Sequence, residues 1–84
     1  MKGYVYLLLS EKDNKTYLGS TNNLEKRYKE HCNGKCTATK HRRPLRIVYI
    51  ENYNSLTYAR NRERYLKTRK GRKYLREIFS KLEL

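Results

Sequence analysis

A single glutamate stands on the apolar stripe of the most basic helix that the sequence predicts. The stripe follows helical spacing through Leu56, Ala59, Glu63 and Leu66. Glu63 is also the only acidic residue in the segment 60–76, which holds nine Lys or Arg residues. An uncompensated charge near a core costs several kcal/mol, so this carboxylate needs a partner. Two interpretations follow: Glu63 coordinates a metal ion, or it forms a salt bridge with Arg27 or with Lys67 one turn further on.

A second helical stripe carries two more polar side chains. It runs through Leu24, Arg27, Tyr28 and His31 at spacings i, i+3, i+4 and i+7. Arg27 and His31 therefore project from the inward-looking edge of that helix, one turn apart. Tyr6 and Tyr17 lie on predicted strands, where packing with a hydroxyl hydrogen bond is the ordinary role of a tyrosine. A chemical role requires a tyrosine hydroxyl to meet Arg27, His31 and Glu63.

A hairpin and a helix must position the first of these groups. The run 3–9 is rich in β-forming residues and apolar on both faces, as in a covered central strand. The polar turn 11–15 contains Asp13 and Asn14, which suit left-handed conformations, and 15–20 is the return strand. Residues 21–23 form an N-cap cluster, the helix spans 24–32, and Asn33-Gly34 ends it.

The second half of the chain predicts one more strand and two helices. Residues 35–43 form a basic loop, and Leu45–Ile50 is the third strand. Asn54-Ser55 caps a helix that runs to about Arg69, Gly71 breaks it, and residues 72–82 form a terminal helix. We therefore expect one domain over residues 1–84. Its class is α+β, an α/β sandwich with a small three-stranded sheet, mixed or antiparallel, flanked by helices in the order β-β-α-β-α-α.

The charge balance predicts a polyanionic partner. The 84 residues contain 21 Lys+Arg and 8 Asp+Glu, which gives a net charge of +13 and a pI near 10.0. The basic loop and the basic helices do not neutralise each other, which favours binding to a phosphate backbone over a merely solvated surface. Neither patch resembles a base-reading module. The residues expected to bind nucleic acid are Lys40, Arg42, Arg43, Arg60, Arg64, Lys67 and Lys70.

Membrane and secreted classes are not expected. The longest apolar run, Val5–Leu9, is too short to cross a bilayer, and no signal-peptide pattern is visible. We expect a cytoplasmic protein with Cys32 and Cys36 as free thiols. A zinc site that adds His31 and His41 is a weaker alternative, because neither a CxxC knuckle nor an HxxxH pair is present.

An ordered set of motifs covers residues 3 to about 70. Tyr4-Val5-Tyr6 is followed, after ten residues, by Tyr17-Leu18-Gly19. The segment from Gly19 to His31, then Thr37 and Arg43-Pro44-Leu45, and finally Ala59-Arg-Asn-Arg-Glu63 complete the set. In this order and spacing the chain resembles the GIY-YIG nuclease superfamily, in particular small stand-alone proteins similar to the N-terminal domain found in excinuclease. It departs from that pattern in having Tyr4 for the first glycine and no counterpart of an asparagine that follows the glutamate helix in larger members.

The resemblance implies a one-metal phosphodiesterase that cuts DNA, with a role in DNA repair or recombination. Glu63 would hold Mg²⁺ or Mn²⁺, and Arg27 would bind the phosphate and offset its charge in the transition state. Tyr6 or Tyr17 would act as general base or position the water, and His31 would orient a tyrosine or a phosphate. We expect all five residues at one concave edge of the sheet.

Other interpretations stay open. The chain could be a nucleic-acid-binding module of low catalytic power, an accessory subunit, or a structural partner in a larger complex. RNA is not excluded as the substrate, and a partner protein could supply specificity.

Overall fold

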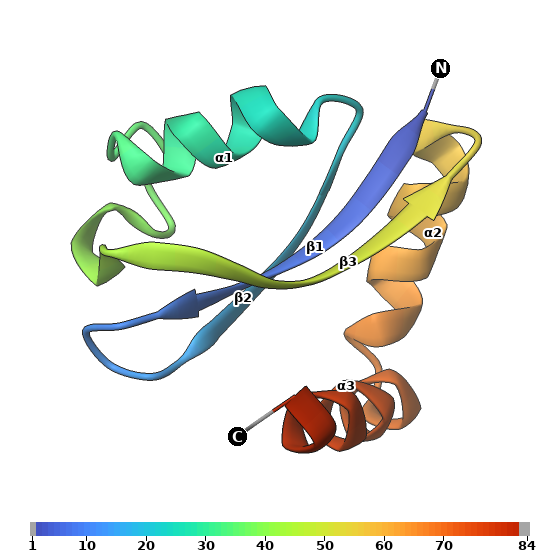
Figure 1. Cartoon of the computed structure of the whole chain (residues 1–84). Coiled ribbons are helices and arrows are strands. Elements are labelled where there is room, and N and C mark those ends of the chain that lie inside the picture. Colours follow the sequence, from blue (N-terminus) through green and yellow to red (C-terminus); the bar gives the residue numbers. More distant parts are fainter. Residues whose placement is uncertain (1, 83–84) are drawn as a thin grey trace.

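A central strand covered on both faces organises the structure. In the computed structural model, which describes residues 2–82, β1 (Gly3–Ser10) lies between β2 (Thr16–Thr21) and β3 (Leu45–Tyr53). Both neighbours pair with β1 in antiparallel register, for example Tyr6 with Gly19 on one side and with Ile50 on the other. The predicted sheet is therefore confirmed and is antiparallel throughout (Figure 1).

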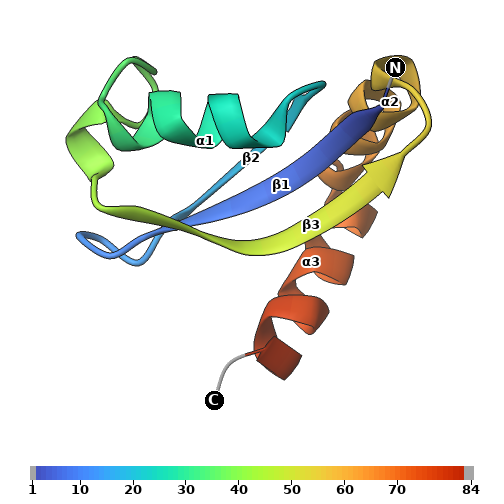
Figure 2. The ribbon, with the colours of Figure 1, turned by 45° about the horizontal axis from the view of Figure 1, so that its top comes forward.

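Alternate residues of β1 serve two separate cores. Tyr6 and Leu8 face α1 (Leu24–Cys32) and pack with Leu45. Val5 belongs to the other core, under α2 (Leu56–Leu66) and α3 (Arg69–Leu82). Figure 2 shows α1 on one side of the sheet and α3 on the other. This two-sided burial explains why the first strand reads as apolar at every position.

The turns and caps around α1 form where the sequence predicts them. Asn14 takes a positive φ of 59° in the β1–β2 turn. Asn23 caps α1, because its side chain accepts a hydrogen bond from the backbone N–H of Lys26 at 3.1 Å. Gly34 follows the helix with a φ of 77°, which favours glycine. A short 3₁₀ turn, η1 (Lys40–Arg42), interrupts the basic loop before β3.

Three predicted boundaries are wrong in the second half. The third strand continues past Ile50 to Tyr53, where the hydroxyls of Tyr49 and Tyr53 both donate to Glu51. Helix α2 ends at Leu66 rather than near Arg69, and α3 begins at Arg69 rather than at residue 72. The last predicted element is thus longer, and the helix preceding it is shorter.

Gly71 lies inside α3 instead of breaking a helix. The chain turns at Lys67 and Thr68, and the Thr68 hydroxyl both donates to the carbonyl of Tyr65 and accepts from the N–H of Gly71. A Cβ on Gly71 would collide with the backbone of Tyr65 and Leu66. The glycine is present because α3 crosses the end of α2 at backbone contact, not because the helix stops there.

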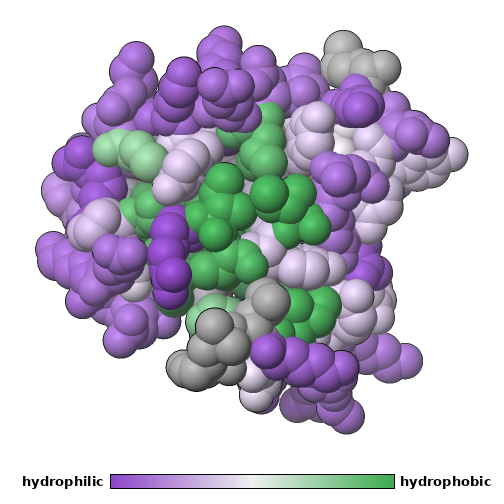
Figure 3. Space-filling view, in the orientation of Figure 1, coloured by the Kyte–Doolittle hydropathy of each residue, from purple (hydrophilic) through white to green (hydrophobic). Residues whose placement is uncertain are grey.

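The outer surface combines a small apolar area with a hydrophilic surround. Figure 3 shows apolar side chains at the centre of the face seen in Figure 1 and hydrophilic residues around them. A chain of this length cannot bury all its apolar surface, and Ile50 stays 41% exposed. Among residues 2–82, no helix is long and apolar enough to span a membrane.

Gly71→Ala should lower the free energy of unfolding by about 1–3 kcal/mol, because the new methyl group meets backbone that cannot move aside. Helix propensity alone predicts the opposite sign, a gain of about 1 kcal/mol. Urea unfolding, with the exposed Lys73→Ala as the matched control on the same helix, separates the two. A more stable Gly71→Ala protein would contradict the close crossing.

Candidate active site

A buried chain of hydrogen bonds links the first strand, the first helix and the basic loop. The Tyr6 hydroxyl lies 3.0 Å from Nε2 of His31, and Nδ1 of His31 lies 2.7 Å from Oγ1 of Thr39. His31 and Thr39 are fully buried and Tyr6 is 2% exposed. The i+7 position on the α1 stripe thus carries a satisfied polar group, which fixes the imidazole ring from both sides.

The surroundings keep both rings of this chain neutral. Burial lowers the pKa of His31, and the nearby Arg27 guanidinium lowers it further. Burial raises the pKa of the Tyr6 phenol, an effect that Arg27 partly offsets. At neutral pH, His31 is therefore an uncharged imidazole, with one ring nitrogen that accepts and one that donates a hydrogen bond.

Gly19 and Tyr17 bring the second strand against these groups. A Cβ on Gly19 would collide with the hydroxyl end of Tyr6, so only glycine leaves room for that ring. The Tyr17 ring is half-buried and lies with its centroid 5.3 Å from that of His31. The three rings of Tyr6, Tyr17 and His31 therefore form one compact cluster on the α1 face of the sheet.

Arg27 holds a permanent positive charge next to this cluster. Its pKa is raised, first by its interaction with the Tyr6 hydroxyl and then by Glu30. Nη1 donates to Oε1 of Glu30 at 3.1 Å, and the side chain is 40% exposed. Much of the guanidinium is thus free to meet an anion arriving from solvent.

Glu63 lies on the other side of β2, on α2. The Ser20 hydroxyl donates to its Oε1 at 2.5 Å, and the Lys67 ammonium lies 2.7 Å from its Oε2. Its side chain is 21% exposed. Of the two salt bridges that the sequence left open, the structure contains the one with Lys67. Because Ser20 directly follows Gly19, the carboxylate and the ring cluster meet across one residue of the edge strand.

A comparison with known protein families matches the part of the chain that holds these site residues. Residues 2–75 match the model of the GIY-YIG catalytic domain. The chain belongs to the GIY-YIG nuclease family. Within the family, this chain is 45% identical over 80 residues to the UPF0213 protein CPE1444 of Clostridium perfringens, covering 93% of this chain and 84% of that protein.

Two further relatives place this GIY-YIG chain among small proteins of similar length. The UPF0213 protein YazA of Bacillus subtilis is 37% identical over 78 residues, which are 88% of this chain and 79% of that one. The solution structure of the UPF0213 protein BH0048 from Bacillus halodurans is 32% identical, with a TM-score of 0.55 over 93% of this chain and 85% of that chain. The β-β-α-β-α-α fold of this chain thus matches the fold of that UPF0213 protein.

The five residues expected in the GIY-YIG site come from four elements and gather near β2, but they do not lie on one face of the sheet. Tyr6, Tyr17 and His31 are in direct contact, and Arg27 adjoins Tyr6. Glu63 makes no hydrogen bond to these four; it reaches the edge strand through Ser20. The sequence predicts one concave edge, whereas the structure divides the set between the two faces that meet there.

A polar pocket opens where the two faces meet. It encloses about 340 Å³ and takes Arg27 and Lys26 from α1, Arg60 from α2 and Ser20 from β2. Three cations face one acid, Glu30, in this lining. A phosphate group fits this composition, since guanidinium and ammonium groups are the usual phosphate ligands in proteins.

The residues expected to bind nucleic acid fall into two sets. Arg42 and Arg43 support the loop: Arg42 pairs with Asp13 at 3.4 Å, and Nε of Arg43 donates to the carbonyl of Lys40 at 3.0 Å. Lys67 is held by Glu63. The other members are exposed and available to a polyanion: Lys40, Arg60, Arg64 and Lys70.

The donor set at Glu63 suits a hard cation rather than zinc. Among residues 2–82, no three His, Cys, Asp or Glu side chains gather closely enough to hold a metal together. Cys32 is exposed and Cys36 is buried, and both are free thiols. Glu63 and the neighbouring Ser20 hydroxyl are the residues that could hold Mg²⁺ or Mn²⁺, ions that take few protein ligands and fill the remainder with water and substrate phosphate.

Two polar contacts of this site were missed by sequence reasoning. Thr39 lies in a loop without periodicity, where nothing separates it from the exposed Thr37. Ser20 stands directly after Tyr17-Leu18-Gly19 and alternates with Gly19 across the strand. Because alternate residues of a strand face opposite sides of the sheet, Ser20 lies on the face opposite Gly19. This signal could have indicated a contact between Ser20 and α2.

Thr39→Val should destabilise the fold by about 1–3 kcal/mol, because Nδ1 of a buried histidine loses its only partner. Thr39→Ser keeps the hydroxyl and should retain most of the stability. Urea unfolding measures both, and ¹⁵N shifts of the His31 ring report whether the tautomer has changed. Equal losses in the two variants would assign Thr39 a packing role only.

The stability of the wild type should fall as the pH drops below about 6.5. The unfolded chain then binds a proton at His31 with an ordinary pKa of about 6.5, whereas the folded chain resists protonation because its pKa is lower. Unfolding midpoints at pH 7.5, 6.5 and 5.5 measure the fall. His31→Gln is the control, since it should lose this part of the pH dependence. Parallel curves for the two proteins would contradict the neutral, buried imidazole.

Proposed function

We propose that this chain is a divalent-metal-dependent endonuclease that hydrolyses phosphodiester bonds in DNA, with DNA repair or recombination as its setting. One observation carries the proposal: a cationic pocket is lined by Arg27, which adjoins Tyr6 of the ring cluster, and by Ser20, which donates a hydrogen bond to the Glu63 carboxylate. A phosphate in that pocket contacts Arg27 on one side and faces Glu63 through Ser20 on the other.

Arg27 binds the scissile phosphate in this scheme. Its fixed charge offsets the charge that develops on the phosphate oxygens, and Lys26 and Arg60 add to the local potential. Glu63 is the residue that would hold Mg²⁺ or Mn²⁺. Lys67 would release the Oε2 oxygen of Glu63 as the ion enters. The bound ion supplies Lewis-acid stabilisation of the phosphate and of the leaving oxygen.

The two tyrosines take different roles. Tyr6 is almost fully buried and its pKa is raised, so it is poorly placed to take a proton from water. Tyr17 is half-buried on the edge strand β2. It is the tyrosine that would accept a proton from the attacking water or position that water. Tyr6 and Thr39 hold the His31 ring in place against Tyr17, with Tyr6 at Nε2 and Thr39 at Nδ1.

The resting ion pair at Glu63 favours a second candidate. Both carboxylate oxygens are occupied, one by Ser20 and one by Lys67, as in a carboxylate with a structural role. A nucleic-acid-binding module of low turnover, or an accessory subunit whose partner protein supplies specificity, would need the cations and no metal.

Cleavage of labelled single-stranded, duplex, flap and four-way-junction DNA in Mg²⁺, Mn²⁺ or EDTA tests the proposal, with RNA of the same sequence as a further arm. Glu63→Gln and Arg27→Ala should each reduce the cleavage rate on the order of 10²-fold or more. Tyr17→Phe should reduce the cleavage rate more than Tyr6→Phe does. Glu25→Gln, on the exposed side of α1, is the matched control and should cleave normally.

Binding is measured alongside by fluorescence anisotropy. Bound DNA that stays intact in every lane, with an affinity unchanged in Glu63→Gln, would overturn the nuclease assignment and leave the binding module. Cleavage that persists in EDTA would overturn the metal dependence.

A further inference from the structure

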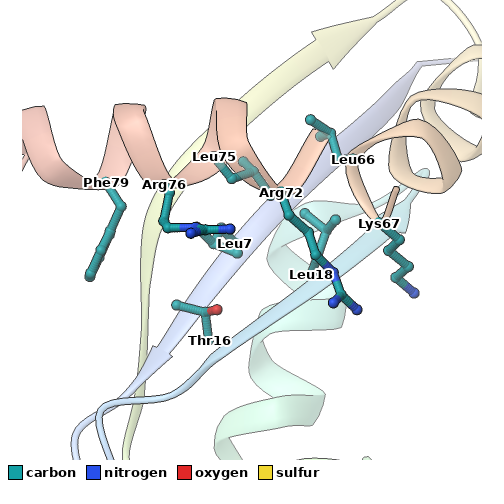
Figure 4. Close-up of a pocket in the computed structure, with 9 residues that line it drawn as sticks. All are labelled: Leu7, Thr16, Leu18, Leu66, Lys67, Arg72, Leu75, Arg76 and Phe79. Carbon is teal, nitrogen blue, oxygen red and sulfur yellow. The ribbon is translucent and has the colours of Figure 1, made fainter. Parts of the chain in front are cut away.

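A groove runs beside the candidate active site, between α3 and the sheet (Figure 4). It encloses about 450 Å³; of its lining, Leu18 belongs to the GIY-YIG motifs and Lys67 has a role proposed above. Its apolar floor is formed by Leu7 and Leu18 from the sheet and by Leu75 and Phe79 from α3. The cations Lys67, Arg72 and Arg76 also line it. The groove thus combines a flat apolar surface with concentrated positive charge.

The groove adjoins Glu63, the candidate metal ligand. Lys67 lines the groove and also contacts Glu63 at 2.7 Å. Ser20, which holds Glu63, is followed on the same face of β2 by Leu18 and Thr16, both of which line the groove. A chain bound at Glu63 and continuing along β2 would therefore enter the groove directly.

Within residues 2–82, two of the three cations that line the groove have no acidic partner, whereas Lys67 pairs with Glu63. Arg72 and Arg76 form no ion pair with an acidic side chain anywhere in residues 2–82. Figure 4 shows both side chains reaching from α3 toward the groove. Two unpaired guanidinium groups above an apolar floor repel each other, and an anionic ligand with a flat apolar part relieves that repulsion.

We propose that this groove binds an unpaired nucleotide of the substrate strand, adjacent to the scissile phosphate. The base would lie on the leucine floor against Phe79, and its phosphate would meet Arg72 and Arg76. The inference rests on the proposed nuclease function and specifies its substrate class: DNA that is single-stranded on one side of the cut. A paired base must first be unstacked and unpaired before it can enter, so the groove favours a strand that is already single.

Binding in EDTA tests the groove apart from catalysis. A fluorescent thymidine oligonucleotide and a duplex of equal length are titrated with the full chain at fixed salt. The double variant Arg72→Gln/Arg76→Gln should weaken single-strand binding by about tenfold and duplex binding by about two- to threefold. The control, Lys73→Gln/Lys81→Gln, removes the same charge from α3 outside the groove and should weaken both ligands by about two- to threefold.

A second measurement follows the apolar floor. Leucine methyl shifts at Leu18 and Leu75 should move on adding the oligonucleotide to the wild type and should not move with inorganic phosphate alone. Equal weakening of both ligands by the two double variants, or unmoved methyl groups, would overturn the groove as a nucleotide site. A sedimentation experiment that finds a dimer whose formation the groove variants abolish would overturn it in favour of a second copy of the chain.

The two proposals fail separately. Loss of groove selectivity with intact metal-dependent cleavage would overturn this inference alone. Selective single-strand binding without cleavage in any metal would overturn the nuclease assignment and retain the site.

Discussion

The position of β1 between two cores is the constraint on which the rest of the structure depends. A three-stranded sheet has one covered strand, and alternate side chains of that strand must go to opposite faces. Tyr6 is sent toward α1, while Val5 is sent toward α2 and α3. Polar groups carried by the helices are divided in the same way, so Arg27 and His31 lie on one face and Glu63 on the other. The polar groups on the two faces approach each other only at an edge of the sheet, and the edge strand β2 provides it.

Helix α2 is held to both edges of the sheet by neighbouring residues. Nε of Arg62 donates to Oε1 of Glu51 on β3 at 2.9 Å, and Glu63 accepts from Ser20 on β2. The Arg62 guanidinium also lies over the rings of Tyr65 and Tyr74, 5.2 and 5.1 Å from their centroids. The contact with β3 thus fixes the rotation of the helix that presents the carboxylate, and a residue outside the candidate site helps to aim it.

Sequence reasoning went furthest where local chemistry determines structure. The hairpin, the Asn23 cap and the span of α1 follow from turn residues and periodicity, and the stripes correctly identified Arg27, His31 and Glu63 as polar groups near a core. It failed at Gly71, because local propensity describes a helix breaker, whereas the close crossing of α2 and α3 is a tertiary fact. It could not assign Thr39 for the same reason, since the contact spans a loop that has no period.

The ion pair between Lys67 and Glu63 has a consequence for how the chain folds. In many small metalloproteins a carboxylate or thiolate cluster repels itself until the ion arrives, so folding waits for the metal. Here the chain carries its own temporary counter-ion, four residues along the same helix. The acidic group is neutralised from the moment α2 forms, so the fold needs no metal ion to offset this charge. Under the proposed metal-dependent function, loading would exchange one positive charge for another at Glu63, and the scaffold would not have to be rebuilt.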